Sequence, residues 1–175
     1  MQGLKIIFTG NGKGKTTAAI GAAVRFAGQG FKVKIIQFIK DSKFRYGEHK
    51  TLEMIPNIEI ESFGKGFIGI LGDRKTEEEH KIAALKAFEA LKKDINSDKY
   101  NMIIADEILG AIFAKLIDEK DVEILIKKCP KDKHLILTGR NASRTLIDLV
   151  DTVTEMKEIK HHYQNGLPPY KGIEY

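Results

Sequence analysis

The chain has 175 residues, of which 42% are hydrophobic and 30% charged, and this suits one domain with an ordinary core over residues 1–175. No apolar run is long enough to cross a bilayer, no secretory signal pattern opens the chain, and a single cysteine excludes a disulfide framework, so we expect a cytoplasmic protein. The net charge of +5 comes from 29 basic and 24 acidic residues without a long basic block, which favours a small anionic ligand over nucleic acid.

Short apolar runs alternate with helical segments along the chain. Strands are expected at residues 4–8, 32–38, 57–62, 100–106, 133–139 and 152–156, and helices at 16–28, 76–95, 107–117, 121–129 and 142–150. Gly28 and Gly30 are expected to end the first helix, and Thr76 with Glu79 forms a predicted capping box at the start of the second. Strands separated by helices pair in parallel, which predicts a three-layer α/β domain with a mostly parallel sheet of about six strands.

Two segments lack a clear period. Residues 40–75 are the least regular, and the run GKGFIGILGD within them carries four glycines, which predicts a loop that closely approaches another group. The tail from residue 157 onward contains the adjacent pair His161 and His162. Neighbouring side chains in an extended tail point apart, and no third ligand follows at metal-site spacing, so we expect a solvated or hydrogen-bonding role for the pair.

The stretch TGNGKGKTT joins the first strand to the first helix, which is the context of a phosphate-binding loop. Its backbone N–H groups and the helix N-terminus would bind phosphate oxygens, Lys15 would reach across the phosphates, and the Thr16 hydroxyl would ligate Mg²⁺. Thr9 stands where the general pattern has its first glycine, which has moved to Gly10. The alternative is a glycine-rich turn without a ligand. The predicted nucleotide-binding residues are Gly10, Asn11, Gly12, Lys13, Gly14, Lys15, Thr16, Thr17 and Arg140.

Two further strand ends carry polar side chains. Asp106 and Glu107 follow a buried-type strand at the edge where ligands of parallel sheets collect, and they are the predicted carboxylates for Mg²⁺ beside Thr16. Glu107 could instead serve only as a favourable acid in the first turn of the next helix. Arg140 follows the strand at 133–139 and could bind a phosphate through two hydrogen bonds, or could be a surface arginine or a partner in a salt bridge.

A larger set of motifs resembles one family. TGNGKGKTTAAIG, VKIIQFIK, GKGF, ADEILGA, LTGRNA and the tail TEMKEIKHHYQNGLPPYKGIEY occur in the order found in the P-loop ATP:corrinoid adenosyltransferases. The resemblance extends from Leu4 to Tyr175, and the threonine at the first glycine position, the QFIK strand end and the tail are its most specific parts.

The resemblance implies the P-loop NTPase (RecA-like) fold and a reaction. In this family the Co(I) of a reduced corrinoid attacks C5′ of the ATP ribose, a Co–C bond forms, and triphosphate leaves. ATP is then expected to lie in the loop in the reverse direction compared with ordinary P-loop hydrolases. By resemblance, Asn11, Lys15, Thr16, Thr17 and Glu107 make nucleotide and metal contacts, with Lys15, Thr16 and Glu107 as the catalytic set. The cofactors implied are ATP as co-substrate, Mg²⁺ and the corrinoid.

The corrinoid side departs from the family. A hydrophobic wall against the corrin helps cobalt to lose its lower ligand, and the family's GF-x-W segment suits that role. Here the segment reads GFIG, with Phe67 in place but Gly69 where tryptophan would stand, and the chain contains no tryptophan. Phe63, Ile68 and Ile70 are the candidates to complete the wall. Phe67 could equally be an ordinary buried anchor of its loop.

The expected partners follow from the same resemblance. They are ATP and a corrinoid, a second copy of the chain, and a flavodoxin-type or flavin reductant, with no nucleic acid and no membrane. The family often has a segment before the first strand that covers the active site, and here Met1 lies a few residues from that strand, so we expect a more exposed corrinoid or a covering partner chain. The competing hypotheses are a P-loop ATPase or kinase and a nucleotide-dependent corrinoid-binding module without turnover.

Overall fold

Six parallel strands form one sheet in the computed structural model, which describes residues 2–66 and 75–174. The strand order is β3-β2-β4-β5-β1-β6, and every adjacent pair is parallel. The strands are β1 (Lys5–Thr9), β2 (Val33–Asp41), β3 (Ile58–Gly64), β4 (Met102–Asp106), β5 (His134–Thr138) and β6 (Thr152–Glu155). The six-stranded α/β architecture that the sequence predicts is therefore confirmed.

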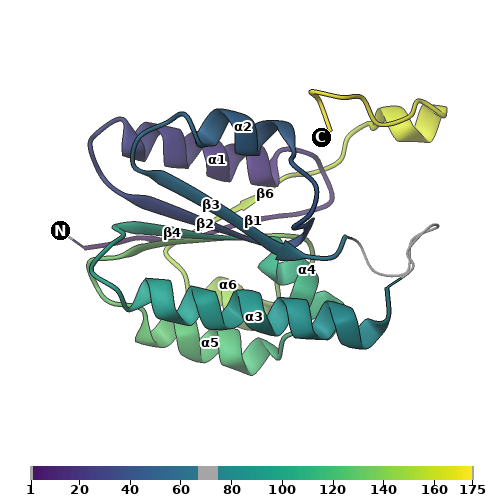
Figure 1. Ribbon diagram of the computed structural model, residues 1–175. Helices are drawn as coiled ribbons and strands as arrows, with labels where there is room; N and C mark the ends of the chain where they lie inside the picture. The colour runs from purple at the N-terminus through teal and green to yellow at the C-terminus, as the bar shows by residue number, and fades with distance from the viewer. Residues whose placement is uncertain (1, 67–74, 175) are drawn as a thin grey trace.

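Helices cover both faces of the sheet (Figure 1). On one face lie α1 (Lys15–Ala27) and α2 (Gly47–Leu52), and on the other lie α3 (Glu77–Ile95), α4 (Ile108–Phe113), α5 (Glu119–Lys128) and α6 (Arg144–Asp148). Each face has its own core, because the central strands are apolar on both sides: Ile35 and Ile104 pack with α1, whereas Ile36 and Ile103 pack with α3. None of the helices in the described ranges is long and apolar enough to cross a membrane.

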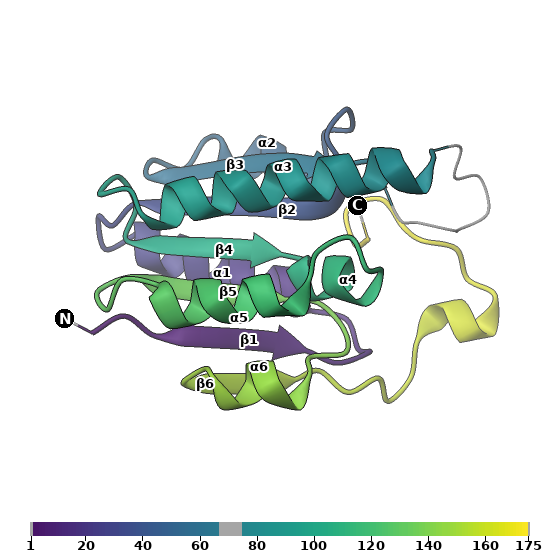
Figure 2. The same ribbon diagram turned by 90° about the horizontal axis from the view of Figure 1, so that it is seen from below.

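All strands point the same way, so their carboxyl ends meet at one edge (Figure 2). The C-terminal segment, which includes the short 3₁₀ helix η1 (His162–Asn165), passes beyond that edge. Loops after the carboxyl ends of parallel strands are where α/β proteins place ligands. The fold therefore gathers the loops after β1, β2, β4 and β5, together with the tail, in one region.

Local signals account for most helix ends. Gly28 follows the last residue of α1, and Gly30 has φ +86°, so both glycines end that helix as expected. Thr76 accepts a hydrogen bond from the Glu79 N–H while the Glu79 carboxylate accepts one from Thr76 N–H, which confirms the predicted capping box of α3.

Three segments differ from the expected elements. The helix expected at 107–117 is shorter, since α4 ends at Phe113 and Lys115 has φ +58°. The helix expected at 142–150 is reduced to α6. Within the irregular segment 40–75, α2 forms a helix that the sequence analysis did not predict, and its six residues are too few and too polar to give a periodic signal.

Candidate functional site

The loop after β1 holds a strongly bent backbone. Gly10 has φ +99° and Gly14, which precedes α1, has φ +110°, a region that side chains with a Cβ rarely adopt. Thr9 remains the last residue of β1 in ordinary strand conformation. The turn that needs glycine therefore begins one residue later than in the general pattern, and this explains physically why Thr9 is tolerated there.

The backbone after β6 supports this loop from the side. Gly12 N–H donates to the Met156 carbonyl over 2.7 Å, and Met156 N–H donates to the Thr9 carbonyl over 2.8 Å. A Cβ built on Gly10 would lie 2.5 Å from the Met156 carbonyl oxygen, and one on Gly12 would lie 2.7 Å from it. The glycines thus permit a close contact between two backbones that fixes the shape of the loop.

Gly10→Ala tests this close contact. We expect it to lower the free energy of unfolding by about 2 kcal/mol and to weaken ATP binding at least tenfold, because the left-handed φ and the Met156 carbonyl both oppose a side chain. Urea unfolding and calorimetric ATP titration measure the two effects. Gly21→Ala is the matched control: it lies inside α1 with nothing within 4 Å of its Cβ position, so we expect it to stabilise the protein by about 0.5–1 kcal/mol. Unchanged ATP binding in Gly10→Ala would contradict this role for the loop backbone.

The first residues of α1 connect the loop to the sheet. Lys15 is buried, and its ammonium donates to the Gly12 carbonyl over 2.8 Å, so it closes the loop on itself. Burial is the main cause that lowers the Lys15 pKa, against the opposing effect of the Glu107 carboxylate. The loop therefore holds a buried cation next to the cavity, which is the arrangement predicted for the binding of an anion.

Asp106 lies at the centre of a buried polar network. Its Oδ1 accepts hydrogen bonds from the Thr16 and Thr138 hydroxyls, each over 2.8 Å, and its Oδ2 accepts one from the Gln37 amide over 3.1 Å. Gln37 and Thr138 belong to the strands on either side of β4, so sheet register brings these groups into one row. Because the Thr16 hydroxyl donates its hydrogen bond to Asp106, the lone pairs of the Thr16 oxygen remain able to bind a cation.

The network continues to the far side of β2. Nε2 of His49 lies 2.8 Å from the Gln37 carbonyl oxygen, and the Ser62 hydroxyl donates to the same oxygen over 2.7 Å. Nδ1 of His49 accepts a hydrogen bond from the Tyr46 N–H, so Nε2 carries the proton of a neutral imidazole and donates it to Gln37. Burial lowers the His49 pKa, which favours this neutral form. The orientation of Asp106 is thereby tied to α2 and β3.

Glu107 begins α4 in a left-handed conformation with φ +61°. Its N–H donates to the Thr138 hydroxyl, and its carboxylate lies where a Cβ on Gly110 would come within 2.9 Å of Oε2. Burial, and next the Asp106 carboxylate, raise the Glu107 pKa. A non-glycine residue in this region stores backbone strain, which is common where a side chain must be aimed at a ligand.

Glu107→Gln should stabilise the folded protein at high pH, where the Glu107 carboxylate is ionised. A raised acid pKa means that the folded state binds the proton more tightly than the unfolded state, so the ionised side chain destabilises the fold progressively as pH rises above about 4.5. We expect the variant, without nucleotide, to melt at a higher temperature than the parent at pH 8, with the gain shrinking towards pH 4.5. Glu78→Gln, on the exposed side of α3, is the control without such a gain. A gain independent of pH would contradict the environment described for Glu107.

Lys15, Thr16 and Glu107 line a cavity of about 820 Å³, to which residues of α1, of α2 and of the loops after β1, β2 and β5 also contribute. The volume lies within the range of about 300–1,000 Å³ common for small-molecule sites. Its lining combines the loop from Asn11 to Thr17 with Glu107 and Arg140 and with the apolar side chains Ile20, Val24, Leu52 and Ile55. A polar, cationic floor beside an apolar wall can hold a phosphate chain and an aromatic base together.

The nine predicted nucleotide-binding residues lie in one region. All but Gly10 line the cavity, and Gly10 shapes the loop from behind. Thr16, Asp106 and Glu107 converge as a set of oxygen groups. Arg140 is exposed after the end of β5, and its charge opposes the rise in the Glu107 pKa that burial and Asp106 cause. The fold therefore brings together side chains that follow three different strands, β1, β4 and β5.

The corrinoid-side residues are only partly described. Phe63, at the end of β3, lines a second cavity of about 370 Å³ with Ser42, Lys65 and residues of α3, apart from the cavity above the phosphate loop. Phe67, Ile68, Gly69 and Ile70 lie outside the described residues. Phe63 also packs against the core beneath α3, so part of its side chain serves the fold.

Several cavity residues were not found from the sequence. Lys40 forms an ion pair with Glu48 and lies 4.7 Å from the centre of the Tyr46 ring, and all three line the cavity. The QFIK strand end signalled Lys40, but nothing in the sequence located α2 opposite it. From the tail, Glu174 also lines the cavity and forms an ion pair with Lys13 of the phosphate loop.

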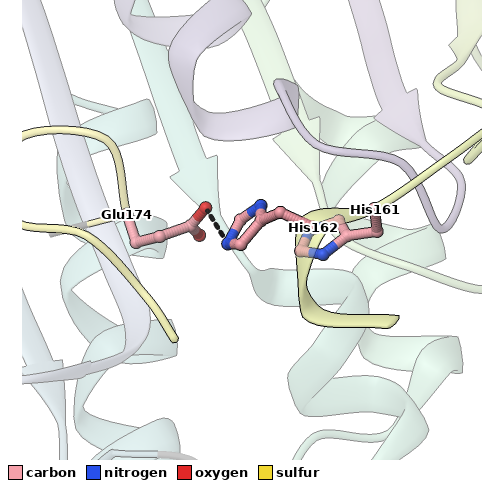
Figure 3. Close-up of side chains that lie close together, drawn as sticks. All are labelled: His161, His162 and Glu174. Carbon is pink, nitrogen blue, oxygen red and sulfur yellow. Dashed lines mark ion pairs between the residues drawn. The ribbon is translucent and has the colours of Figure 1, made fainter. Parts of the chain in front are cut away.

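The expectation for the two histidines was wrong in its geometry. The rings of His161 and His162 do not point apart but stack, with centroids 4.5 Å apart and planes 25° from parallel. Glu174 comes close to them from twelve residues further along the chain, with its Oε1 3.6 Å from Nε2 of His162 (Figure 3). The expected hydrogen-bonding role does occur, since Nδ1 of His161 accepts the Tyr163 N–H over 3.2 Å. The physical reason is that η1 and the following turn fold the tail back on itself, which spacing in the sequence does not reveal.

The fold resembles that of solved structures at low sequence identity. A KaiC-like protein from Pyrococcus horikoshii matches with a TM-score of 0.52 and 16% identity over 89% of this chain and 73% of that one. The RadB recombinase matches with a TM-score of 0.54 and 14% identity over 91% of this chain and 77% of that one. At such identities the likeness shows the fold alone.

Sequence comparison is more specific. A protein from Escherichia coli K12 described as a corrinoid adenosyltransferase is 33% identical over 99% of this chain and 86% of its own length. Relatives of the same description from Salmonella typhimurium and a Sinorhizobium species are 32% and 35% identical, each over 99% of this chain and 86% and 81% of their own lengths. The family model for ATP:corrinoid adenosyltransferase BtuR/CobO/CobP matches residues 1–175. With the phosphate loop and the strand-end carboxylates in place, these matches show that the chain belongs to the ATP:corrinoid adenosyltransferase family.

Proposed function

We propose that this protein transfers the 5′-deoxyadenosyl group of ATP to the Co(I) of a reduced corrinoid and releases triphosphate, in the synthesis or salvage of adenosylcobalamin. The observation that carries the proposal is the cavity of about 820 Å³, which joins a complete phosphate loop to an apolar wall in a chain of this family. Cobalt donates an electron pair to C5′, the C5′–O bond breaks, and its electrons leave with the triphosphate. No general base is required.

The protein's task is then to hold C5′ in line with cobalt and to stabilise charge on the leaving group. The loop N–H groups, Lys13, Lys15 and Arg140 supply positive charge for the triphosphate. Lys15 donates to the Gly12 carbonyl in the nucleotide-free protein, and an incoming phosphate oxygen offers it a stronger, charged acceptor. Asn11 and Thr17 lie beside the same cavity and complete the polar contacts that we assign to the nucleotide.

The oxygen groups near Lys15 fit Mg²⁺, which prefers hydroxyl, carboxylate and phosphate oxygens. We infer that the Thr16 oxygen and the Glu107 carboxylate would hold the ion. Asp106 is only 1% exposed and accepts three hydrogen bonds, so its part is to orient the Thr16 hydroxyl. When bound, Mg²⁺ supplies charge neutralisation for the departing triphosphate.

The finer parts of the proposal rest on family likeness. They are the homodimer, the cytoplasmic setting, the flavodoxin-type or flavin reductant, the reverse direction of ATP in the loop, and a corrin-side wall that uses Phe63, Phe67 and Ile68 without a tryptophan. Family membership disfavours the two alternatives, an ordinary P-loop ATPase or kinase and a binding module without turnover.

An anaerobic turnover assay tests the proposal. The protein is mixed with MgATP and chemically reduced cob(I)alamin, and the corrinoid absorbance is followed before and after exposure to light. We expect a light-sensitive adenosylcorrinoid and ATP consumption only when the reduced corrinoid is present. ATP consumption at the same rate without corrinoid would identify an ATPase, and ATP binding without any product would identify a binding module.

A further inference from the structure

The C-terminal segment brings three potential metal ligands together. One ring nitrogen each of His161 and His162 and one carboxylate oxygen of Glu174 all lie within 4.8 Å of one another. All three residues are half-buried, and Figure 3 shows the stacked rings beside the carboxylate. Within the described residues, no other group of three or more His, Cys, Asp or Glu side chains meets that distance.

We propose that His161, His162 and Glu174 bind a divalent transition-metal cation of the Zn²⁺ class. Two imidazole nitrogens and one carboxylate oxygen form a donor set that suits Zn²⁺ and its neighbours, and three protein ligands leave a fourth position for water. Mg²⁺ prefers oxygen ligands and keeps much of its water, so it competes poorly for this set. The site is therefore distinct in chemistry from the oxygen groups around Thr16.

The backbone already holds the ligands close to a binding arrangement. The 3₁₀ helix η1 begins at His162 and ends at Asn165, and the next residue, Gly166, has φ +75°, which reverses the chain. Further on, the Tyr170 carbonyl accepts the N–H groups of Ile173 and Glu174, which turns the chain back towards the histidines. Ligand atoms around a tetrahedral Zn²⁺ are about 3.3 Å apart, so shifts of about 1 Å would complete the site.

Two interactions of the ligand residues oppose a bound cation. Lys13 forms an ion pair with Oε1 of Glu174, so a bound cation would repel its ammonium or displace it. Nδ1 of His161 accepts a hydrogen bond from the Tyr163 N–H. Coordination through Nδ1 would use the same lone pair, and coordination through Nε2 would place the ring proton on Nδ1, so either mode breaks this hydrogen bond. Removal of the Lys13 charge is therefore expected to tighten metal binding.

A bound cation would also fix the tail. His161 and Glu174 both line the cavity beside the phosphate loop. One ion coordinated by both would join the two ends of the 161–174 segment beside that cavity. It would also exchange partners with Lys13, which we assign to the triphosphate, so metal and nucleotide would be coupled through a single lysine.

Calorimetric titration of Zn²⁺ alone into the full chain, without nucleotide and with millimolar Mg²⁺ in a non-coordinating buffer, tests the site. We expect one Zn²⁺ per chain, affinity at least about tenfold weaker in His162→Ala and in Glu174→Gln, and tighter binding in Lys13→Gln. His134→Gln is the matched control with unchanged binding, since His134 starts β5 and bonds to Leu4 N–H. Far-ultraviolet circular dichroism identifies any variant that is not folded.

Visible absorption of the Co²⁺-loaded protein gives a second readout, with bands of a four-coordinate nitrogen–oxygen site that His162→Ala abolishes. Absence of saturable Zn²⁺ binding would overturn the proposal. So would equal affinity in the parent, His162→Ala and Glu174→Gln, because the ion would then be bound elsewhere. Loss of binding in Lys13→Gln would likewise overturn the arrangement described. None of these outcomes depends on adenosyl transfer.

Discussion

Lys15→Met is expected to reduce kcat/KM for MgATP at least hundredfold in the adenosyl-transfer assay. Lys15 is buried in the loop, and that burial lowers its pKa. The charged form is therefore unfavourable without a ligand, and a bound anion would stabilise it. Loss of one preorganised donor to charge that grows in a transition state typically costs about 10²–10³ in rate. Initial rates of adenosylcorrinoid formation, measured over a range of MgATP concentrations, give the value.

The matched control is Lys128→Met, an exposed lysine at the end of α5, which should leave the rate unchanged. Because burial of a lysine costs stability, Lys15→Met should be at least as stable as the parent in urea unfolding. If Lys15→Met were inactive and also unfolded, the loss of rate would result from the loss of structure. A folded Lys15→Met with nearly full activity would remove Lys15 from the catalytic set.

Asp106→Ala is expected to be the most destabilising change in the site, at about 3 kcal/mol. The substitution leaves the Thr16 hydroxyl, the Thr138 hydroxyl and the Gln37 amide without their common acceptor in a buried position. Thr16 also loses the bond that orients its oxygen, so the apparent affinity for Mg²⁺ in the assay should fall at least tenfold. Urea unfolding and an Mg²⁺ titration of the rate measure the two consequences.

Asp98→Ala, an exposed acid in the turn before β4, serves as the control and should change the free energy of unfolding by no more than about 0.5 kcal/mol. Glu107→Gln adds a useful contrast, because it should weaken Mg²⁺ dependence while it stabilises the nucleotide-free protein at pH 8. If Asp106→Ala kept the parent's stability and Mg²⁺ dependence, the buried network would not be what positions Thr16.

The parts of the site that were predictable from the sequence lie at the ends of central strands. Asp106 and Glu107 follow a continuous apolar run, and the glycines and Lys15 follow another, so local signals suffice once the sheet is parallel. The same holds for the capping box of α3. In each of these cases the residues that determine the structure are adjacent in the sequence.

The parts that could not be predicted depend on distant contacts. The Met156 carbonyl supports Gly12 from more than a hundred residues away, and the ion pair of Lys13 with Glu174 joins the two ends of the chain. The helix α2 forms without an apolar period, and it holds His49 against Gln37 inside the sheet edge. The stacked histidines follow from the folded tail and not from their spacing.

The measurement that tests the central claim most directly follows the fate of the oxygen atom between C5′ and the α-phosphorus of ATP. ATP labelled with ¹⁸O at that bridge is turned over anaerobically with cob(I)alamin, and the phosphate product is identified by ³¹P nuclear magnetic resonance and mass spectrometry. Attack on C5′ predicts intact triphosphate that carries the label. ADP and inorganic phosphate, with the label retained in ADP, would contradict adenosyl transfer and make the phosphate loop that of an ordinary hydrolase.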